Sequence, residues 1–487
     1  HQWELGATAR RWGGNATSRY NWELGNAWNT ANDWFFRNVN HTGVPGYSYT
    51  HYLDANLTRG MKTALTLPMI GWVAKDTSSH GFSVATFGPQ AATDPHAPDA
   101  GNGVDLRGQR IKPGPPELTS VPASPDFIGR WVKAIRKRDA EKGVRSVHMY
   151  ILDNEPALWN DTHRDVHPEP LTYDELLQRT LAYGTAVRKA DPDAVIAGPA
   201  EWGWPAYHYS AKDAQVGFLL APDRRAHGNV PLVPWLLRKV RESERQTGVR
   251  ILDVLDLHFY PQGKGIGVGT GGQTDPGTNE RRIRSTRALW DPTYVDESWI
   301  EQPVRLIPLM REWVAHNAPG LALSIGEYSF GAEGHMSGGL ALAEALGRFG
   351  QQGLDSAFYW TYPAANSPAF WAFRAYRNFD GKGGRFLDYS VPTRSSAPYA
   401  SLFASRDAAG GHLVAVLLNL DPERPVRAQL NLAGCGAPSS RRTFRYVGDA
   451  TGFTELPASA VEGLQDTLPP YSITVLDLTV ATPPRAR

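Results

Sequence analysis

The chain has 487 residues, and its 50 basic and 49 acidic side chains leave a formal net charge of only +1. This balance argues against a nucleic-acid partner, which requires a basic face, and it gives no support for a polybasic membrane anchor. No run approaches the roughly 18 apolar residues of a transmembrane helix, and the single cysteine, Cys435, excludes an internal disulfide framework and a multi-cysteine zinc site.

The first 380 residues alternate between predicted strands and predicted helices. Apolar runs bounded by Gly, Pro or polar residues predict seven strands, at residues 7–14, 62–71, 148–155, 194–199, 252–260, 321–328 and 356–360. Amphipathic patterns with start signals predict five helices, at residues 125–143, 172–189, 231–247, 301–316 and 337–352. Ser124-Pro125-Asp126 predicts a helix start, and Thr172 with Glu175 predicts a capping box.

Two segments in this region are predicted to be irregular. The aromatic, asparagine-rich residues 20–36 indicate a long loop, which is more typical of a functional than of a disordered segment here. Residues 76–122, rich in Pro, Gly and Asp, indicate an irregular insertion.

Strands that alternate with helices imply a parallel sheet, and at this length a (β/α)8 TIM-like barrel fits best. Beyond about Asp380 the pattern changes to short strands separated by turns, at residues 401–405, 412–420, 427–432, 443–447 and 472–479. This pattern indicates an antiparallel β-sandwich. We therefore expect a barrel domain over residues 1–380 and a sandwich domain over residues 381–487.

The stretch from His148 to Asn160 is the strongest functional signal. It begins as a strand and breaks at Asp153-Asn154-Glu155-Pro156, because proline cannot donate a ladder hydrogen bond. A carboxylate at a strand end, with an amide before it and Trp159 after it, is suited to sugar cleavage, although it could also be an ordinary polar strand end.

A second carboxylate, Glu327, ends another predicted strand 172 positions later (327 − 155). A barrel would bring the two together, since the carboxyl ends of its strands surround one mouth. Glycoside hydrolysis needs a protonated acid at the leaving oxygen and a carboxylate at the anomeric carbon. Tyr260 could hold Glu327, whereas His258, on the same strand face, could be either a site residue or a core histidine.

Several motifs resemble glycoside hydrolase family 44, whose members are endo-acting β-1,4-glucanases, some with activity on xyloglucan or xylan. The similarity covers nearly the whole chain and is clearest in Ala9-Arg-Arg-Trp-Gly-Gly-Asn15, Leu65-Thr-Leu-Pro-Met69, Asp153-Asn-Glu-Pro-Ala-Leu-Trp159, Leu289-Trp-Asp-Pro-Thr-Tyr294 and Gly326-Glu-Tyr-Ser329. The resemblance implies retention of anomeric configuration, with Glu155 as acid/base and Glu327 as nucleophile. It implies no catalytic cofactor, but a structural metal such as calcium in some members.

The resemblance also sets an expectation about the sheet. If Glu327 lies on strand seven of the barrel, the strand of Arg11 is strand two, and strand one would precede His1. We therefore predict a gapped sheet edge beside the strand of Arg11.

Other side chains are candidates for substrate binding. Asn154 could bond a sugar 2-hydroxyl, and Asn15 lies at a strand end that should face the mouth. Five tryptophans are candidate sugar platforms, although each could equally pack in the core: Trp34, Trp159, Trp290, Trp299 and Trp360.

Weaker signals point elsewhere. Residues 267–272 fit a dinucleotide fingerprint, but Gln-Thr-Asp-Pro-Gly follows, so no helix can begin there. The Asp161/His163 and Asp165/His167 pairs could suggest a metal site, although hydrogen bonds that order a loop are the more common use. Glu201 and Glu333 follow strands closely and are the alternatives if either catalytic assignment fails.

The sequence therefore predicts a secreted, monomeric endo-β-1,4-glucanase whose leader is absent from this chain and whose partner is a polysaccharide. Two alternatives stay open: a carbohydrate-binding barrel without catalysis, and another retaining hydrolase such as a mannanase or an arabinofuranosidase.

Overall fold

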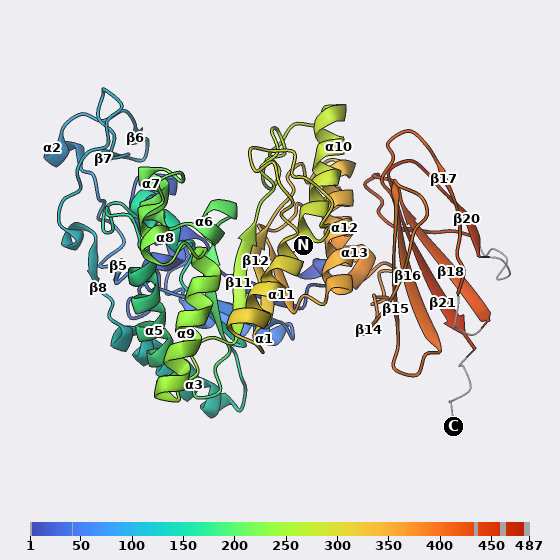
Figure 1. The fold of residues 1–487 in the computed structure, drawn as a ribbon, viewed down its shortest axis with the longest axis horizontal. Helices are drawn as coiled ribbons and strands as arrows, with labels where there is room; N and C mark the ends of the chain where they lie inside the picture. The colour runs from blue at the N-terminus through green and yellow to red at the C-terminus, as the bar shows by residue number, and fades with distance from the viewer. Residues whose placement is uncertain (1, 41, 433–436, 458–463, 482–487) are drawn as a thin grey trace. The chain divides into compact units, whose positions relative to one another are not determined.

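The structure is a computed structural model, which describes residues 2–40, 42–432, 437–457 and 464–481 (Figure 1). Cys435 lies outside the described residues. The chain forms two compact units, one of residues 8–259 and 310–326 and the other of residues 1–7, 260–309 and 327–487.

A seven-stranded sheet occupies the places where the sequence predicts seven strands. Its order is β1 (Ala9–Trp12), β4 (Lys62–Leu67), β9 (Met149–Leu152), β10 (Ile196–Glu201), β11 (Val254–Phe259), β12 (Ala322–Tyr328) and β13 (Ser356–Tyr359). The pairs from β1 to β11 are parallel. Within the described residues β1 is an edge strand, which confirms the predicted open edge beside the strand of Arg11.

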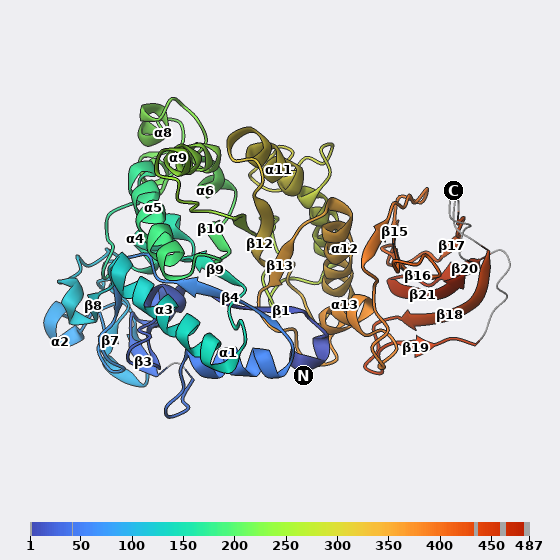
Figure 2. The same cartoon turned by 90° about the horizontal axis from the view of Figure 1, so that it is seen from below.

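Amphipathic helices cover the sheet in the unit of residues 8–259. Helices α3 (Pro125–Lys142), α5 (Tyr173–Ala190) and α9 (Leu232–Thr247) lie side by side next to β9 and β10 (Figure 2). The Ser124 side chain caps α3 by accepting from the backbone of Phe127, as predicted. At α5 only half of the predicted capping box forms: Thr172 accepts from the backbone of Glu175, whose carboxylate is bound by His167 instead.

Three predictions about local structure are wrong in detail. Helix α10 (Pro276–Ser285) begins inside Gln273-Thr-Asp-Pro-Gly277, where the sequence analysis excluded a helix, because the Asp275 side chain caps it by accepting from the backbone of Thr278. Residues 20–36 contain β2 (Ala27–Asn29), which pairs with β3 (Asn38–Asn40), because the side chain of Asn29 bonds Asn38 and the carbonyl of Phe36. Helix α11 (Leu306–Asn317) starts five residues after the predicted position 301. The backbone φ angles of Glu301 and Arg305 are 48° and 36°, a left-handed conformation that a helix cannot include.

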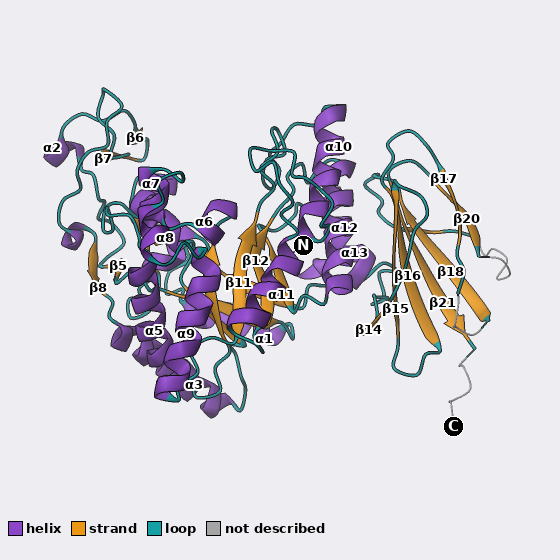
Figure 3. Cartoon of the chain, in the orientation of Figure 1, coloured by secondary structure: helices purple, strands orange, loops and turns teal. Residues whose placement is uncertain are grey.

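The predicted irregular insertion contains only short elements, as Figure 3 shows. Strand β5 (Trp72–Ala74) pairs with β8 (Ser120–Pro122), and β6 (Thr93–Asp94) pairs with β7 (Ala97–Gly101). The remaining helices and turns are α1 (Tyr49–Thr58), α2 (Val84–Phe87), α4 (Trp159–Thr162), α6 (Trp204–His208), α7 (Ala211–Val216), α8 (Pro222–Ala226), α10 (Pro276–Ser285), η1 (Gln2–Leu5), η2 (Asn15–Arg19), η3 (Ala31–Trp34), η4 (Pro116–Leu118), η5 (Pro156–Leu158) and η6 (Thr286–Leu289).

The C-terminal part is an antiparallel sandwich. Its six-stranded sheet has the order β14 (Tyr389–Val391), β15 (Ala400–Arg406), β16 (His412–Asn419), β21 (Ser472–Val480), β18 (Pro438–Tyr446) and β19 (Thr454–Glu455). The second sheet pairs β17 (Val426–Gln429) with β20 (Gln465–Leu468), and a core that includes Leu417, Leu468 and Leu476 lies between the two. The fold class is therefore the predicted one, a TIM-like barrel followed by a β-sandwich.

The other face of the six-stranded sheet is also buried. Strand β16 alternates with period two, so that Val416 points away from the sandwich core and pairs with Phe403 of β15. Helices α12 (Met336–Gln352) and α13 (Pro368–Arg377) pack on this face, where Gly347 gives the ring of Phe403 room to approach the helix backbone. No helix in the described parts of the chain is long and apolar enough to cross a membrane.

Candidate active site

The turn after β9 sets the position of Glu155. Asp153 and Glu155 have φ angles of 63° and 46°, and the 3-10 turn η5 begins directly afterwards at Pro156. Left-handed backbone at non-glycine residues costs of order 1–3 kcal/mol each, and persists only where the surroundings enforce it. Such conformations cluster at functional sites, which agrees with the role predicted for this turn.

Asp153 is the residue that enforces the turn, and the sequence analysis missed it. Its fully buried carboxylate accepts hydrogen bonds from the hydroxyl of Ser18 and from the backbone of Met69, Asn154 and Ile70, the last two at 2.8 and 2.9 Å. Burial raises the pKa of Asp153 to about 6, against these hydrogen bonds. A carboxylate two residues before the acid therefore ties β9 to the segment that follows β4.

Glu155 is held by the backbone and by a histidine. Its N–H donates to the carbonyl of Ala200 at 3.0 Å, and its Oε1 lies 2.8 Å from Nδ1 of His258. His258 is fully buried on β11, so the structure favours the site role over the plain core role that the sequence left open. A neutral imidazole can donate to a carboxylate or accept from a carboxylic acid, depending on its tautomer.

Glu327 lies near the end of β12 and is almost fully buried. The hydroxyl of Tyr260 donates to its Oε2 at 2.8 Å, as the sequence predicted. The residue before it must be small: a Cβ on Gly326 would lie 2.4 Å from the carboxylate of the buried Asp256.

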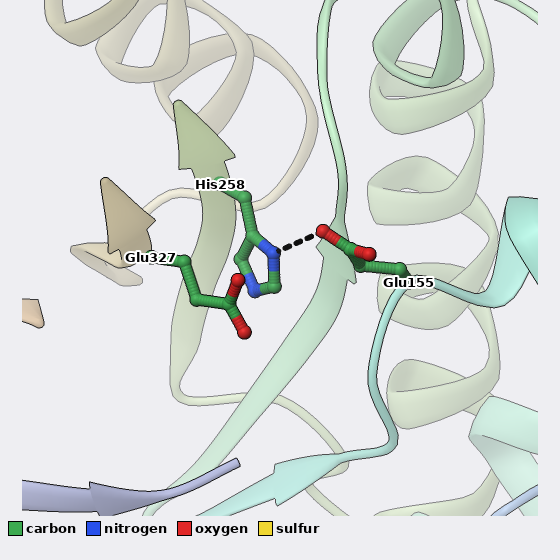
Figure 4. A group of neighbouring side chains, drawn as sticks. All are labelled: Glu155, His258 and Glu327. Carbon is green, nitrogen blue, oxygen red and sulfur yellow. Dashed lines mark hydrogen bonds and ion pairs between the residues drawn. The ribbon is translucent and has the colours of Figure 1, made fainter. Parts of the chain in front are cut away.

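Glu155, His258 and Glu327 form one group. Each has a ligand atom that lies within 4.8 Å of those of the other two, and Figure 4 shows both carboxylates directed toward the imidazole. His258 and Tyr260, two residues apart, thus each contact one of the two glutamates. The same group could hold a metal ion by its geometry, but two carboxylates and a histidine are also what acid/base and nucleophilic catalysis need.

Three of the four side chains of the alternative metal site after Glu155 are engaged by other groups, whereas both ring nitrogens of the buried His163 lack a hydrogen-bond partner among the described residues. Asp165 accepts a bidentate pair of hydrogen bonds from the buried Arg19, and Asp161 accepts from Arg110 and Asn32. His167 contacts Glu175.

A polar chain surrounds the amide next to the acid. Arg11 donates to Oδ1 of Asn154 at 2.7 Å, and Nδ2 of Asn154 donates to Asn15 at 3.2 Å. Asn15 donates in turn to Asp33. The structure therefore brings together two predicted substrate-binding amides, and fixes the orientation of both.

The five predicted tryptophan platforms divide into two groups. Trp34 is 44% exposed, with its indole N–H held by Asp94 at 2.9 Å; Trp299 is 55% exposed, and Trp360 is half-buried after β13. Trp159 is fully buried beneath Arg179, so its ring is not available to a sugar and the prediction is wrong for this residue. Trp290 is half-buried, and the guanidinium of Arg348 lies 3.9 Å from the centroid of its ring, over one face.

The glycine-rich segment 267–272 has a structural role. Fully buried Arg282 donates to the carbonyls of Ile266, Gln273 and Phe330, which joins this segment to the loop after β12. A Cβ on Gly267 would lie 2.5 Å from the backbone of Gly272, so close packing of the chain explains the glycines.

A barrel whose strands end in two glutamates, each held by a neighbouring hydrogen-bonding side chain, defines a glycoside hydrolase. The family model of glycoside hydrolase family 44 matches residues 27–263. Endoglucanase A of Paenibacillus lautus is 31% identical over 494 residues, an alignment that covers 96% of this chain and 67% of the relative. The chain belongs to glycoside hydrolase family 44.

Solved structures agree with this assignment. CelM2, a bifunctional glucanase-xylanase from a metagenome library, is 37% identical with a TM-score of 0.92, over 98% of this chain and 93% of that one. A family 44 xyloglucanase from Paenibacillus polymyxa, solved with xyloglucan, is 29% identical with a TM-score of 0.81, over 98% and 94% of the two chains.

Proposed function

We propose that this glycoside hydrolase is a retaining endo-β-1,4-glucanase, with Glu155 as acid/base and Glu327 as nucleophile. The observation that carries the proposal is the pair of hydrogen bonds from one segment of chain: His258 to Glu155 and Tyr260 to Glu327, both at 2.8 Å. Each glutamate thereby has a partner suited to its part in a double displacement.

In the first step a Glu327 oxygen attacks the anomeric carbon as its bond to the leaving oxygen breaks, and Glu155 gives that oxygen its proton. The products are a shortened glucan and a glycosyl ester of Glu327. In the second step Glu155 takes a proton from water, whose oxygen attacks the same carbon and releases Glu327. Two inversions retain the configuration, and no catalytic cofactor takes part.

The spacing of the carboxylates supports retention over inversion. The catalytic carboxyl groups lie about 5–5.5 Å apart in retaining enzymes and about 6.5–9.5 Å apart in inverting ones, which must fit a water between them. One oxygen of Glu155 and one of Glu327 lie within 4.8 Å of each other, which is closer to the retaining range than to the inverting one.

The substrate we propose is a cellulose-type β-1,4-glucan, with xylan or xyloglucan as further substrates, as the names of the related structures suggest. The side chains proposed to bind it are Asn15, Trp34, Asn154, Trp290, Trp299 and Trp360.

Further proposals concern the whole protein. We propose that residues 1–380 form the catalytic barrel domain and residues 381–487 the sandwich domain, and that the protein acts as a secreted monomer. Bound calcium with a structural role is also a proposal, which metal analysis of the purified protein would test.

A panel of polysaccharides tests the function. Wild type should release short oligosaccharides from carboxymethyl-cellulose, and Glu327→Gln should abolish this activity. Glu333→Gln is the matched control, because Glu333 is a buried glutamate that accepts from Tyr359 at 2.9 Å, in a different role. NMR of the first products should show the β-anomer.

Other outcomes would favour the alternatives. Turnover that survives both Glu155→Gln and Glu327→Gln would contradict this pair, and binding without turnover by wild type would indicate a carbohydrate-binding barrel. Release of single sugars, or preference for mannan, would indicate an arabinofuranosidase or a mannanase. A first product with the α-configuration would exclude retention.

A further inference from the structure

A β-bulge at the end of β10 faces the turn that carries Glu155. In the pairing with β11, Pro199 aligns with Asp256 and Glu201 with the next residue, Leu257, so Ala200 is an extra residue. Ala200 has a φ of 54°, as expected for a residue pushed out of the ladder. Bulges beside active sites commonly redirect a side chain, and here the redirected side chain is that of Glu201.

The bulge holds the turn on both sides of its proline. The carbonyl of Ala200 accepts from the N–H of Glu155 at 3.0 Å, and Oε2 of Glu201 accepts from the N–H of Ala157 at 3.3 Å. Pro156, between them, has no N–H to donate. Every backbone donor from Glu155 to Ala157 is therefore bound by the bulge.

Glu201 is fully buried, and its environment favours the uncharged acid. Burial raises the pKa of Glu201 well above its usual value, and the negative charge of Glu155 raises it further, whereas the backbone N–H groups of Ala157 and Trp202 oppose the shift. Both carboxylates also raise the pKa of Tyr207, after burial, so the three groups share one environment.

Tyr207 connects this environment to the other partner of Glu155. Its hydroxyl donates to the backbone carbonyl of His258, whose ring contacts the Glu155 carboxylate. Within the described residues, the titratable groups that act on one another here are thus Glu155, Glu201 and Tyr207, and the negative charge of Glu155 opposes the ionisation of Glu201.

We propose that Glu201 is a positioning residue for the acid/base: an uncharged carboxylic acid that fixes the turn of Glu155 through Ala157 without adding a second negative charge beside it. The inference rests on the proposed role of Glu155. It assigns Glu201 a part in proton transfer to the leaving group that it exerts through the position of Glu155, because Glu201 itself is fully buried.

Aryl cellobiosides separate this role from a general structural one. A 2,4-dinitrophenyl group leaves without a proton, whereas the sugar leaving group of cellotetraose requires one. Acid/base catalysis contributes about 10²–10⁴-fold, so a displaced Glu155 should forfeit part of that factor. We expect Glu201→Ala to lower kcat/KM for cellotetraose about 10- to 100-fold, but for the dinitrophenyl substrate less than about fivefold.

Azide provides the second readout. It attacks the glycosyl-enzyme without base catalysis, so it should raise kcat of Glu201→Ala on the dinitrophenyl substrate and yield a glycosyl azide. Glu201→Gln offers an acceptor to Ala157 and is always neutral, so it should retain activity within about threefold and keep the alkaline limb of the pH profile.

Three results would overturn the inference. Equal losses on both substrates without azide rescue would show a structural role, and Glu201→Gln as damaging as Glu201→Ala would show that the ionisable group is needed. An alkaline limb that moves to lower pH in Glu201→Gln would show that Glu201 is charged in wild type, because removing a negative charge lowers the pKa of the neighbouring acid. This measurement does not depend on Glu201→Ala and can be made even if that variant fails to fold.

Glu155→Ala serves as the benchmark. If it lacks the leaving-group dependence and azide rescue, the proposed function fails. If it has both and Glu201→Ala has neither, only the inference about Glu201 fails.

Discussion

Tyr260→Phe removes one hydroxyl and, with it, the 2.8 Å hydrogen bond to Oε2 of Glu327. A hydrogen bond to a charged group contributes about 1.5–3 kcal/mol. Since about 1.36 kcal/mol corresponds to a tenfold change in an ionisation equilibrium, the loss makes ionised Glu327 roughly 10- to 100-fold less favoured. Because the nucleophile must be ionised, the acidic limb of the kcat/KM profile should move up by about one to two pH units.

The measurement is kcat/KM for a soluble glucan from pH 3 to pH 9, for wild type and two variants. Tyr359→Phe is the matched control, because it removes an equivalent hydrogen bond to Glu333, at 2.9 Å, outside the proposed pair. Its profile should keep the wild-type acidic limb. If Tyr260→Phe also keeps that limb, or if both variants shift alike, Tyr260 does not stabilise the nucleophile and the reasoning about Glu327 is wrong.

Three further substitutions test other parts of the structure. Gly326→Ala would place a Cβ 2.4 Å from the buried carboxylate of Asp256. We expect β12, which carries Glu327, to shift, and kcat to fall at least about tenfold, because small displacements of reacting groups are costly. An unchanged kcat would show that Asp256 moves aside freely. Gly347→Ala would bring a Cβ within 2.4 Å of a buried phenylalanine ring on β15, and should lower the free energy of unfolding in chemical denaturation by about 1–3 kcal/mol. The control is Gly350→Ala in the same helix, whose Cβ would meet nothing within 4 Å and which should raise the free energy of unfolding by up to about 1 kcal/mol. Similar effects at both positions would contradict this packing. Burial raises the pKa of Asp153 from 3.8 to about 6. Its contribution to the free energy of unfolding is therefore complete below about pH 4 and is lost as the pH rises through 6, by about 3 kcal/mol for a shift of about 6 − 3.8 = 2.2 units. Asp153→Asn should abolish this part of the pH dependence of Tm, whereas curves of Tm against pH that run parallel for wild type and variant would show that the hydrogen bonds keep Asp153 ionised.

Sequence patterns predicted the strands and the two glutamates because both depend on local signals. Buried parallel strands are continuous apolar runs, and Pro156 marks where one of them must end. The missed start of α11 has two causes. Pro303 disfavours helix at Gln302 before it, a local signal that the prediction passed over, and the left-handed φ angles of Glu301 and Arg305 exclude the segment from the helix. Such angles are imposed by tertiary contacts, which no local pattern records.

The tryptophans show the same limit at the site. Trp34 and Trp159 both follow predicted strand ends and carry identical side chains, yet one is 44% exposed and the other fully buried. The difference arises because Arg179, on a helix that begins 14 residues after Trp159 (173 − 159), covers its ring. Asp153 was missed for a similar reason, since its partners near Ser18 and Met69 are remote in sequence.

The two partners at the end of β11, His258 on the strand and Tyr260 directly after it, suit the opposite needs of the glutamates that they contact. The nucleophile must stay ionised until it attacks, and a tyrosine hydroxyl, which donates at any pH well below its own pKa of about 10, stabilises that form continuously. The acid/base must alternate between acid and carboxylate in every cycle, so a fixed donor would oppose one of its two states. An imidazole nitrogen can donate in one state and accept in the other, which makes His258 a suitable partner for Glu155. Because a strand directs residues i and i+2 to the same face, a spacing of two places both partners on the side where the carboxylates meet, and exchanging the two side chains should impair catalysis more than removing either hydrogen bond alone.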